Sequence, residues 1–176
     1  GMSAMKFDKK IMLGVFGASS RGKSSTLLFL IEKLKLDENN FILINEEKTA
    51  DTKQDQIAIF EKNGLKIGVS TAGDIRKIVK KEVGKLIKEE CEIIITATRS
   101  KGKTTDIFNQ LAKEYEYNAQ WFEKNTNAKE WSNEWLCKDS NLKKSKEMSV
   151  IRDQYLDKLN ETDAQFLFDY IDSLTQ

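Results

Sequence analysis

The segment from residue 10 to residue 36 constrains the fold more than any other part of the chain. Residues 10–16, KIMLGVF, are mostly apolar, and they end at a glycine-rich stretch that reads GASSRGKS from Gly17 to Ser24. Beyond this stretch, leucine and isoleucine recur at helical spacing up to residue 36. The order predicts a short buried strand, a tight loop and an amphipathic helix, which together form a unit of α/β folds.

The same alternation of apolar and amphipathic segments continues to about residue 124. The expected strands are residues 41–47, 57–62, 65–70, 91–99 and 118–124, and the expected helices are residues 74–88 and 105–115. Asn63-Gly64 lies between two of the apolar runs, which is a strong hairpin signal. We therefore expect an α/β fold with a mostly parallel mixed sheet that includes a β-hairpin, and with the first strand central.

The rest of the chain has a different pattern. Residues 125–147 are polar and carry Trp131 and Trp135, which would share a helical face and could bind a protein partner or cap one end of the sheet. Two amphipathic helices are expected to follow, divided near residues 160–162. Because 176 residues suit one domain, we expect a single domain over residues 1–176, with residues 128–176 as a helical C-terminal extension packed on it.

Composition excludes several classes of function. The chain has no histidine, which rules out Ser-His and Cys-His nucleophiles, and its two cysteines form no zinc-binding pair. The net charge of +1 provides no overall field for nucleic acid, which argues against a nucleic-acid partner. No apolar run approaches the roughly 18 residues of a membrane span, and no secretory leader is recognisable, so we expect a cytoplasmic protein without a membrane partner.

The stretch from Gly17 to Ser24 fits the spacing GxxxxGK[ST]. Glycines let such a loop curl so that its main-chain N–H groups converge on a phosphate, and the helix that starts near Lys23 adds its positive N-terminal end. Lys23 would then reach the β- and γ-phosphates, and the Ser24 hydroxyl would join the Mg²⁺ shell. The competing interpretation is an ordinary glycine-rich turn with a solvated lysine. In the free protein we expect Lys23 to be partly exposed.

On these residues the chain resembles the P-loop NTPase superfamily, and the alternation up to about residue 124 is compatible with the three-layer fold of that superfamily. The resemblance implies nucleoside-triphosphate binding, with Lys23 as a catalytic cation, and does not distinguish ATP from GTP. The residues implied to bind the nucleotide are Gly17, Ala18, Ser19, Ser20, Arg21, Gly22, Lys23, Ser24 and Ser25.

A second strand-to-helix junction, IIITATRSKGKTT, can be aligned on the first. It has alanine where the first junction begins with glycine, and this alanine would crowd a full phosphate cradle. Arg99, Lys101 and Lys103 could instead hold the phosphate of a second substrate, or neutralise charge on the γ-phosphoryl group, in which case Arg99 would be catalytic. The alternative is a solvated connector in which Thr104 or Thr105 caps the next helix.

A carboxylate beside the loop would complete a magnesium site. Asp74 is the first candidate because it closely follows an expected strand, and together with Ser24 it would bind the metal. Its alternative role is to cap the helix that begins there. Other candidates stand at strand ends or in the polar connection between strands: Glu46, Glu47, Asp51 and Asp55.

Residues 70–74, STAGD, resemble the switch segment of small GTPases, although Ser70 occupies the position of the acid and no Asn-Lys-x-Asp guanine reader is present. Two functions therefore stay open. The first is ATP- and Mg²⁺-dependent phosphoryl transfer, as in small-molecule kinases with a phosphorylated acceptor, or hydrolysis of the nucleotide. The second is a GTPase-like switch or interaction module with little turnover, in which the C-terminal helices bind a protein partner.

Overall fold

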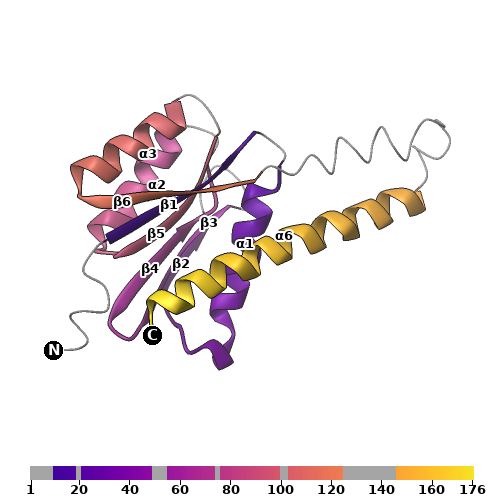
Figure 1. The fold of residues 1–176 in the computed structure, drawn as a ribbon, viewed down its shortest axis with the longest axis horizontal. Helices are drawn as coiled ribbons and strands as arrows, with labels where there is room; N and C mark the ends of the chain where they lie inside the picture. The colour runs from indigo at the N-terminus through magenta and orange to yellow at the C-terminus, as the bar shows by residue number, and fades with distance from the viewer. Residues whose placement is uncertain (1–9, 19–20, 49–54, 74–75, 100–102, 125–145) are drawn as a thin grey trace.

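The computed structural model describes residues 10–18, 21–48, 55–73, 76–99, 103–124 and 146–176. Its centre is a six-stranded sheet with the order β2-β3-β4-β5-β1-β6 (Figure 1). The strands are β1 (Lys10–Gly17), β2 (Ile42–Lys48), β3 (Gln56–Lys62), β4 (Leu65–Ser70), β5 (Ile93–Arg99) and β6 (Tyr117–Glu123). The helices are α1 (Lys23–Lys35), the 3₁₀ turn η2 (Asp37–Asn39), α2 (Arg76–Lys88), α3 (Lys103–Glu114) and α6 (Lys146–Leu174).

Strands β4, β5, β1 and β6 run parallel, and β3 runs antiparallel to β2 and β4. The mostly parallel mixed sheet is confirmed, and so is the hairpin, in which Asn63 and Gly64 join β3 to β4 with φ angles of 51° and 81°. Two consecutive positive φ angles are typical of the tight turn that Asn-Gly favours.

The position predicted for the first strand is wrong in one respect. β1 pairs with β5 and β6, so it is an interior strand, but it lies next to the edge instead of at the centre. The reason is that β6 is the last strand on that side, while the β3–β4 hairpin and β2 all add to the other side.

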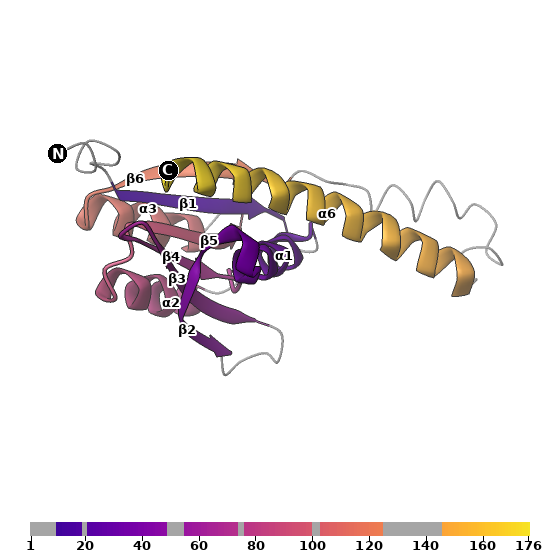
Figure 2. The ribbon, with the colours of Figure 1, turned by 90° about the horizontal axis from the view of Figure 1, so that it is seen from below.

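Helices cover both faces of the sheet (Figure 2). On one face, α1 and the second half of α6 pack against Val15 and Ile95. On the other face, α2 and α3 place Val79 and Phe108 against Met12. Side chains alternate along β1 and β5, so each of these strands contributes to both hydrophobic cores.

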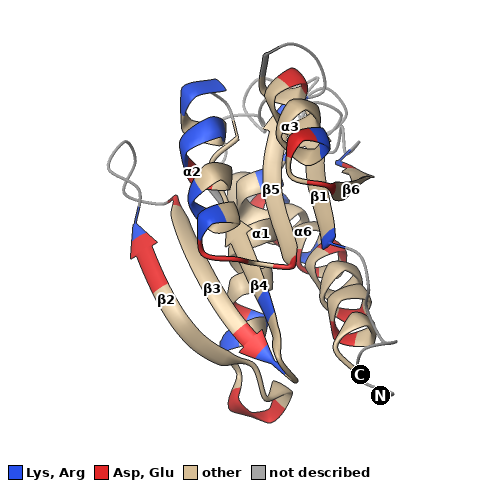
Figure 3. Ribbon diagram, turned by 90° about the vertical axis from the view of Figure 1, so that its left-hand side faces the viewer, with Lys and Arg blue, Asp and Glu red and all other residues tan. Residues whose placement is uncertain are grey.

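Helix α2 is amphipathic and strongly basic on its outer face. Figure 3 shows lysine and arginine along its length, and the exposed members are Arg76, Lys77, Lys80, Lys81 and Lys88. Its buried side, which carries Val79, Val83 and Leu86, faces the sheet. The apolar residues of this helix thus recur on the side that packs against the core, as in an amphipathic helix.

The C-terminal helix is longer than expected. α6 is unbroken, so the prediction of two helices divided near residues 160–162 is wrong. The helix contains no proline or glycine, and the polar residue that suggested a break, Asn160, is buried and hydrogen-bonded. The second half of α6 packs on α1 and the sheet, whereas Val150, Ile151 and Tyr155 in the first half are exposed.

Trp131 and Trp135 lie outside the described residues, so the predictions about their shared face stay predictions. Among the helices that the structure describes, none combines the length and the hydrophobicity needed to cross a membrane.

Candidate functional site

The glycine-rich stretch lies at the carboxyl edge of the sheet, where ligands of parallel sheets bind. β1 ends at Gly17 and α1 begins at Lys23, so the predicted order of strand, loop and helix is confirmed. Gly22 is the N-cap of α1, no side chain in the described residues caps it, and the first turn carries no acid. Such a helix end offers N–H groups and a positive potential to an anion.

The other residues of the stretch are placed as follows. Ala18 and Ser25 are exposed, and Arg21 is half-buried. Ser19 and Ser20 lie outside the described residues.

Both glycines of the stretch are required by close packing. Gly22 has a φ angle of 88°, and a Cβ atom there would lie 2.4 Å from Oδ1 of Asn160. A Cβ atom on Gly17 would lie 2.6 Å from the main-chain oxygen of Lys124. The loop is therefore enclosed by the end of β6 and by α6, two elements that no sequence pattern linked to it.

Lys23 folds back over the loop. Its side chain is only 6% exposed, and Nζ donates hydrogen bonds to the main-chain oxygens of Gly17 at 2.7 Å and Thr98 at 2.8 Å. The prediction that Lys23 is partly exposed is wrong, because carbonyl oxygens at the ends of β1 and β5 hold the ammonium group inward. Phosphate oxygens carry more negative charge than carbonyl oxygens, and they would accept stronger hydrogen bonds from the same group.

Ser24 reaches the end of β4. Its Oγ donates to the main-chain oxygen of Thr71 at 2.9 Å, although β5 separates β1 from β4 in the sheet. The contact forms because the chain after β4 lies tightly against β5, where a Cβ atom on Gly73 would lie 2.2 Å from the main-chain oxygen of Ala97. The tight packing of Gly73 thus brings Thr71 to the start of α1.

Asp55, a secondary candidate for the metal-binding carboxylate, is hydrogen-bonded to Thr71, the residue that Ser24 contacts. Thr71 Oγ1 donates to Asp55 Oδ1 at 2.9 Å and accepts a hydrogen bond from Gln56 N at 3.0 Å. Because β3 is antiparallel to β4, its first residues lie at the edge where the parallel strands end. Asp74 and Asp51 lie outside the described residues, so the predicted role of Asp74 at the metal stays a prediction.

Glu46 and Glu47 lie far from the loop along the sheet. Both are on β2, which three strands separate from β1. Glu46 forms an ion pair with Lys35 at 2.6 Å, and Glu47 forms one with Lys85. The hydrogen bond from Lys85 lowers the pKa of Glu47 below its ordinary value. Both carboxylates therefore serve surface ion pairs, and the structure does not bring them to Ser24.

Arg99 stands beside the first glycine, because β5 pairs with β1 in a register that places it opposite Gly17. Its side chain is exposed. Its main chain forms hydrogen bonds with two threonine side chains. Arg99 N donates to Thr104 Oγ1 at 2.9 Å, and Thr105 Oγ1 donates to Arg99 O at 2.6 Å. α3 begins at Lys103, so Thr104 and Thr105 lie inside its first turn, and the prediction that one of them is the N-cap of this helix is wrong. Both hydroxyl groups instead bind the main chain of Arg99.

The structure describes less of the other two cations of the second junction, Lys101 and Lys103. Lys101 lies outside the described residues, and only the main chain of Lys103, the first residue of α3, is described. A convergence of three cations at this edge therefore stays a prediction.

Two buried hydroxyl groups lie at the same strand ends. Ser70 and Thr98 are fully buried, and neither Ser70 Oγ nor Thr98 Oγ1 has a hydrogen-bond partner within the described ranges. Ser70 occupies the position where the GTPase-like pattern would have an acid, so β4 ends in a hydroxyl group there. Sequence reasoning did not single out Thr98, although threonine in an otherwise apolar strand was an available signal.

The described groups fit a magnesium ion in part. The Ser24 hydroxyl and the Asp55 carboxylate are oxygen groups of the kind that Mg²⁺ prefers. In the part of the chain that the structure describes, no three His, Cys, Asp or Glu side chains cluster together as a metal site. A magnesium ion here would take its remaining ligands from phosphate oxygens and water, as is usual where Mg²⁺ binds with a phosphorylated substrate.

Comparisons of the chain with known protein families, with curated protein sequences and with solved structures returned no match. Function is therefore inferred from the geometry of the loop and its surroundings.

Proposed function

We propose that the chain binds a nucleoside triphosphate with Mg²⁺ at residues 17–24 and transfers or hydrolyses its γ-phosphoryl group, as P-loop NTPases do. The position of Lys23 carries the proposal. Its Nζ lies within 2.8 Å of the main-chain oxygens of Gly17 and Thr98, beside the N-terminus of α1, which no side chain of the described residues caps. A phosphate placed over the loop would accept hydrogen bonds from this ammonium group and from the first N–H groups of α1.

Ser24 and Asp55 would provide the metal side of the site. Ser24 would contribute its hydroxyl oxygen, and Asp55 would act on the metal through bound water, with Thr71 holding both residues at the same edge. Phosphoryl transfer depends mainly on positioning and on neutralising negative charge, which Lys23, a metal ion and Arg99 could supply in a chain without histidine.

ATP is the nucleotide that we expect, because the sequence contains no Asn-Lys-x-Asp guanine reader. A small phosphorylated acceptor is the expected second substrate. Arg99, Lys101 and Lys103 would bind the acceptor's phosphate. This role needs the second junction to face the nucleotide, which the exposed side chain of Arg99 next to Gly17 permits.

A nucleotide-dependent switch with little turnover is the second candidate. The end of β4 favours it, because Ser70 and Thr71 lie there and the nearby carboxylate belongs to Asp55, the residue that precedes β3. If no carboxylate takes a proton from the attacking water, hydrolysis of the nucleotide would be slow. The switch would then act through a protein that binds the C-terminal helix.

The test is calorimetric titration with Mg·ATP, Mg·GTP and inorganic tripolyphosphate, followed by a phosphate-release assay. We expect Lys23→Ala to weaken triphosphate binding at least about tenfold, because a charge-assisted hydrogen bond is lost. Lys33→Ala, on the last turn of the same helix, should leave the affinity unchanged and controls for net charge. Equal affinities of a folded Lys23→Ala protein and the parent would reject the site, and turnover with candidate acceptors separates the enzyme from the switch.

A further inference from the structure

A buried polar network behind the loop has no part in the function proposed above. Lys124, directly after β6, has a fully buried side chain. Its Nζ donates to Asn160 Oδ1 at 2.9 Å and forms an ion pair with Asp163, and both partners belong to α6. A buried ammonium group is costly unless it is paired, so this network fixes α6 to the end of β6.

The network contacts both glycines of the loop. Lys124 N donates to Phe16 O at 2.7 Å, and the main-chain oxygen of Lys124 packs directly on Gly17. The side-chain amide of Asn160 packs directly on Gly22, and its Oδ1 also accepts a hydrogen bond of 3.4 Å from Thr26 Oγ1. Lys124 therefore covers the first glycine and Asn160 covers the second, while a hydrogen bond joins the two covering residues.

Asparagine is intrinsically unfavourable in the middle of a helix. Its helix propensity is below that of alanine or leucine, because its amide competes for main-chain hydrogen bonds. Asn160 is nevertheless buried in the middle of α6, at a position where an apolar residue would continue the packing of Ala164 and Leu167. Its contacts with Gly22, Thr26 and Lys124 account for its presence there.

We propose that Asn160 is a positioning residue for the phosphate loop, so that occupancy of the loop and docking of α6 are coupled. The inference depends on the proposed function for its ligand, although the contact itself does not. A triphosphate that binds over Gly22 and holds it in place would strengthen the contact of Gly22 with Asn160. By reciprocity, the contact then strengthens triphosphate binding by the same factor, and a variant that lacks the contact loses that gain.

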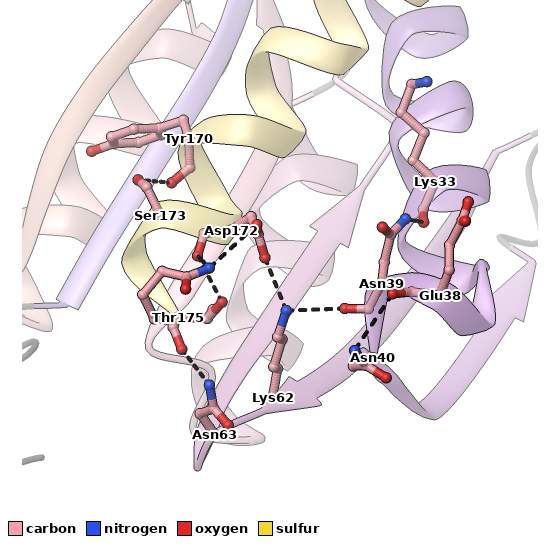
Figure 4. A network of polar contacts seen from close by, with 11 residues as sticks. Lys33, Glu38, Asn39, Asn40, Lys62, Asn63, Tyr170, Asp172, Ser173 and Thr175 are labelled. Atoms are coloured by element: carbon pink, nitrogen blue, oxygen red, sulfur yellow. Dashed lines mark hydrogen bonds and ion pairs between the residues drawn. The ribbon is translucent and has the colours of Figure 1, made fainter.

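A contact near the C-terminal end of α6 offers a matched control for the Asn160 substitution. Figure 4 shows Lys62 Nζ donating to Asp172 Oδ1 at 2.9 Å and to Asn39 O at 3.0 Å. Lys62 ends β3, so this anchor lies at the opposite edge of the sheet from the loop. Removing the Asp172 carboxylate loosens α6 without changing any residue that contacts Gly17 or Gly22.

The experiment compares the full chain with Asn160→Ala and Asp172→Ala by amide hydrogen exchange and by titration with Mg·ATP. We expect Asn160→Ala to accelerate exchange in residues 17–26 and to weaken binding at least about fivefold. Asp172→Ala should accelerate exchange only near the end of α6 and change the affinity by less than about twofold. Equal effects of the two variants on the loop, or no effect of either, would overturn the proposal.

Two further results keep the inference separate from the proposed function. If the parent protein binds no triphosphate, the proposed function fails, and loop exchange in the two variants still decides whether Asn160 positions the loop. If Asn160→Ala does not fold, the parent alone is measured with and without Mg·ATP. The nucleotide should then slow exchange in residues 157–168 more than in residues 169–176, and uniform slowing would overturn the coupling.

Discussion

Lys23 Nζ donates a hydrogen bond to the main-chain oxygen of Thr98, 2.8 Å away and 75 positions later in the sequence. The bond joins the start of α1 to the end of β5. A second hydrogen bond from Lys23 Nζ, to Gly17 O, joins the two ends of the loop. In the free protein, Lys23 therefore contributes to the fold as well as to the proposed site. A triphosphate would have to replace at least part of these contacts in order to bind.

Lys23→Ala should consequently reduce stability, which a solvated lysine would not do. We expect the free energy of unfolding to fall by about 1–3 kcal/mol, because two buried carbonyl oxygens lose a charged donor. Urea denaturation followed by circular dichroism measures the change, and Lys33→Ala serves as the control for removing a lysine from α1. Equal stabilities of the two variants would show that Lys23 is solvated in solution.

Asp55→Asn tests the metal side of the site. The substitution keeps a hydrogen-bond acceptor for Thr71 but removes the charge, so the fold should persist. We expect the affinity for Mg·ATP to fall about tenfold, as for loss of a group next to a metal ligand. Binding of ATP in the presence of a chelator should not weaken, because a negative charge near the phosphates is gone.

The control for Asp55→Asn is Thr71→Val, which removes the hydroxyl link to Asp55 without changing the charge of the site. It should lower the affinity less than Asp55→Asn does. If Asp55→Asn leaves the Mg²⁺ dependence intact, Asp74 becomes the carboxylate to change next.

The sequence predicted features that depend on local pattern. Apolar periodicity located the strand, loop and helix around Lys23, and Asn63-Gly64 predicted the hairpin, because both signals depend on neighbouring residues. The hydrogen bond between Thr71 and Asp55 depends on where the antiparallel β3 lies in the sheet order, which no short segment encodes. The inward fold of Lys23 likewise depends on Thr98, a residue of another strand.

The C-terminal helix also shows that local sequence pattern does not predict tertiary contacts. A polar residue between two apolar sets was interpreted as a helix break, and the structure shows that Asn160 is instead the residue that contacts Gly22 and Lys124. The burial of Lys124 was also unexpected, since lysine is rarely buried without a partner and its partners are 36 and 39 positions away. Tertiary contacts, which pattern reasoning does not reach, decided both positions.

Gly22→Ala separates backbone strain from the contact with Asn160. Gly64 is a matched control, because its φ angle of 81° is close to the 88° of Gly22, but a Cβ atom there would meet nothing within 4 Å. We expect Gly64→Ala to cost about 1 kcal/mol through strain alone, and Gly22→Ala to cost more because Asn160 must also move.

The additional loss of stability in Gly22→Ala, relative to Gly64→Ala, should be smaller when Asn160→Ala is also present. Alanine at position 160 leaves room for the new methyl group at position 22. Chemical denaturation of the two single variants and the double variant gives the coupling free energy. Strict additivity of the two changes would mean that Asn160 does not touch Gly22 in solution.

Cys91 and Tyr117 should make stability fall at alkaline pH. Tyr117 Oη donates to the main-chain oxygen of Cys91 at 2.5 Å, and both residues lie in the core under α2 and α3. Burial raises the pKa of Cys91 from its ordinary 9.0 to about 12 and that of Tyr117 from 10.0 to about 12. The folded state therefore favours the neutral forms, whereas the unfolded chain ionises near the ordinary pKa values.

The sign of the effect follows from proton release. Well below pH 9, the ordinary pKa of the thiol, both groups are neutral in the folded and unfolded states, and their contribution to stability is complete. As the pH rises towards 12, the unfolded chain loses protons that the folded protein retains, so the free energy of unfolding falls. A variant with Cys91→Ala and Tyr117→Phe lacks both titrating groups and is otherwise identical to the parent. Urea denaturation of both proteins from about pH 8 to about pH 11 should show a steeper loss for the parent, and parallel curves would mean that the two groups ionise equally in both states.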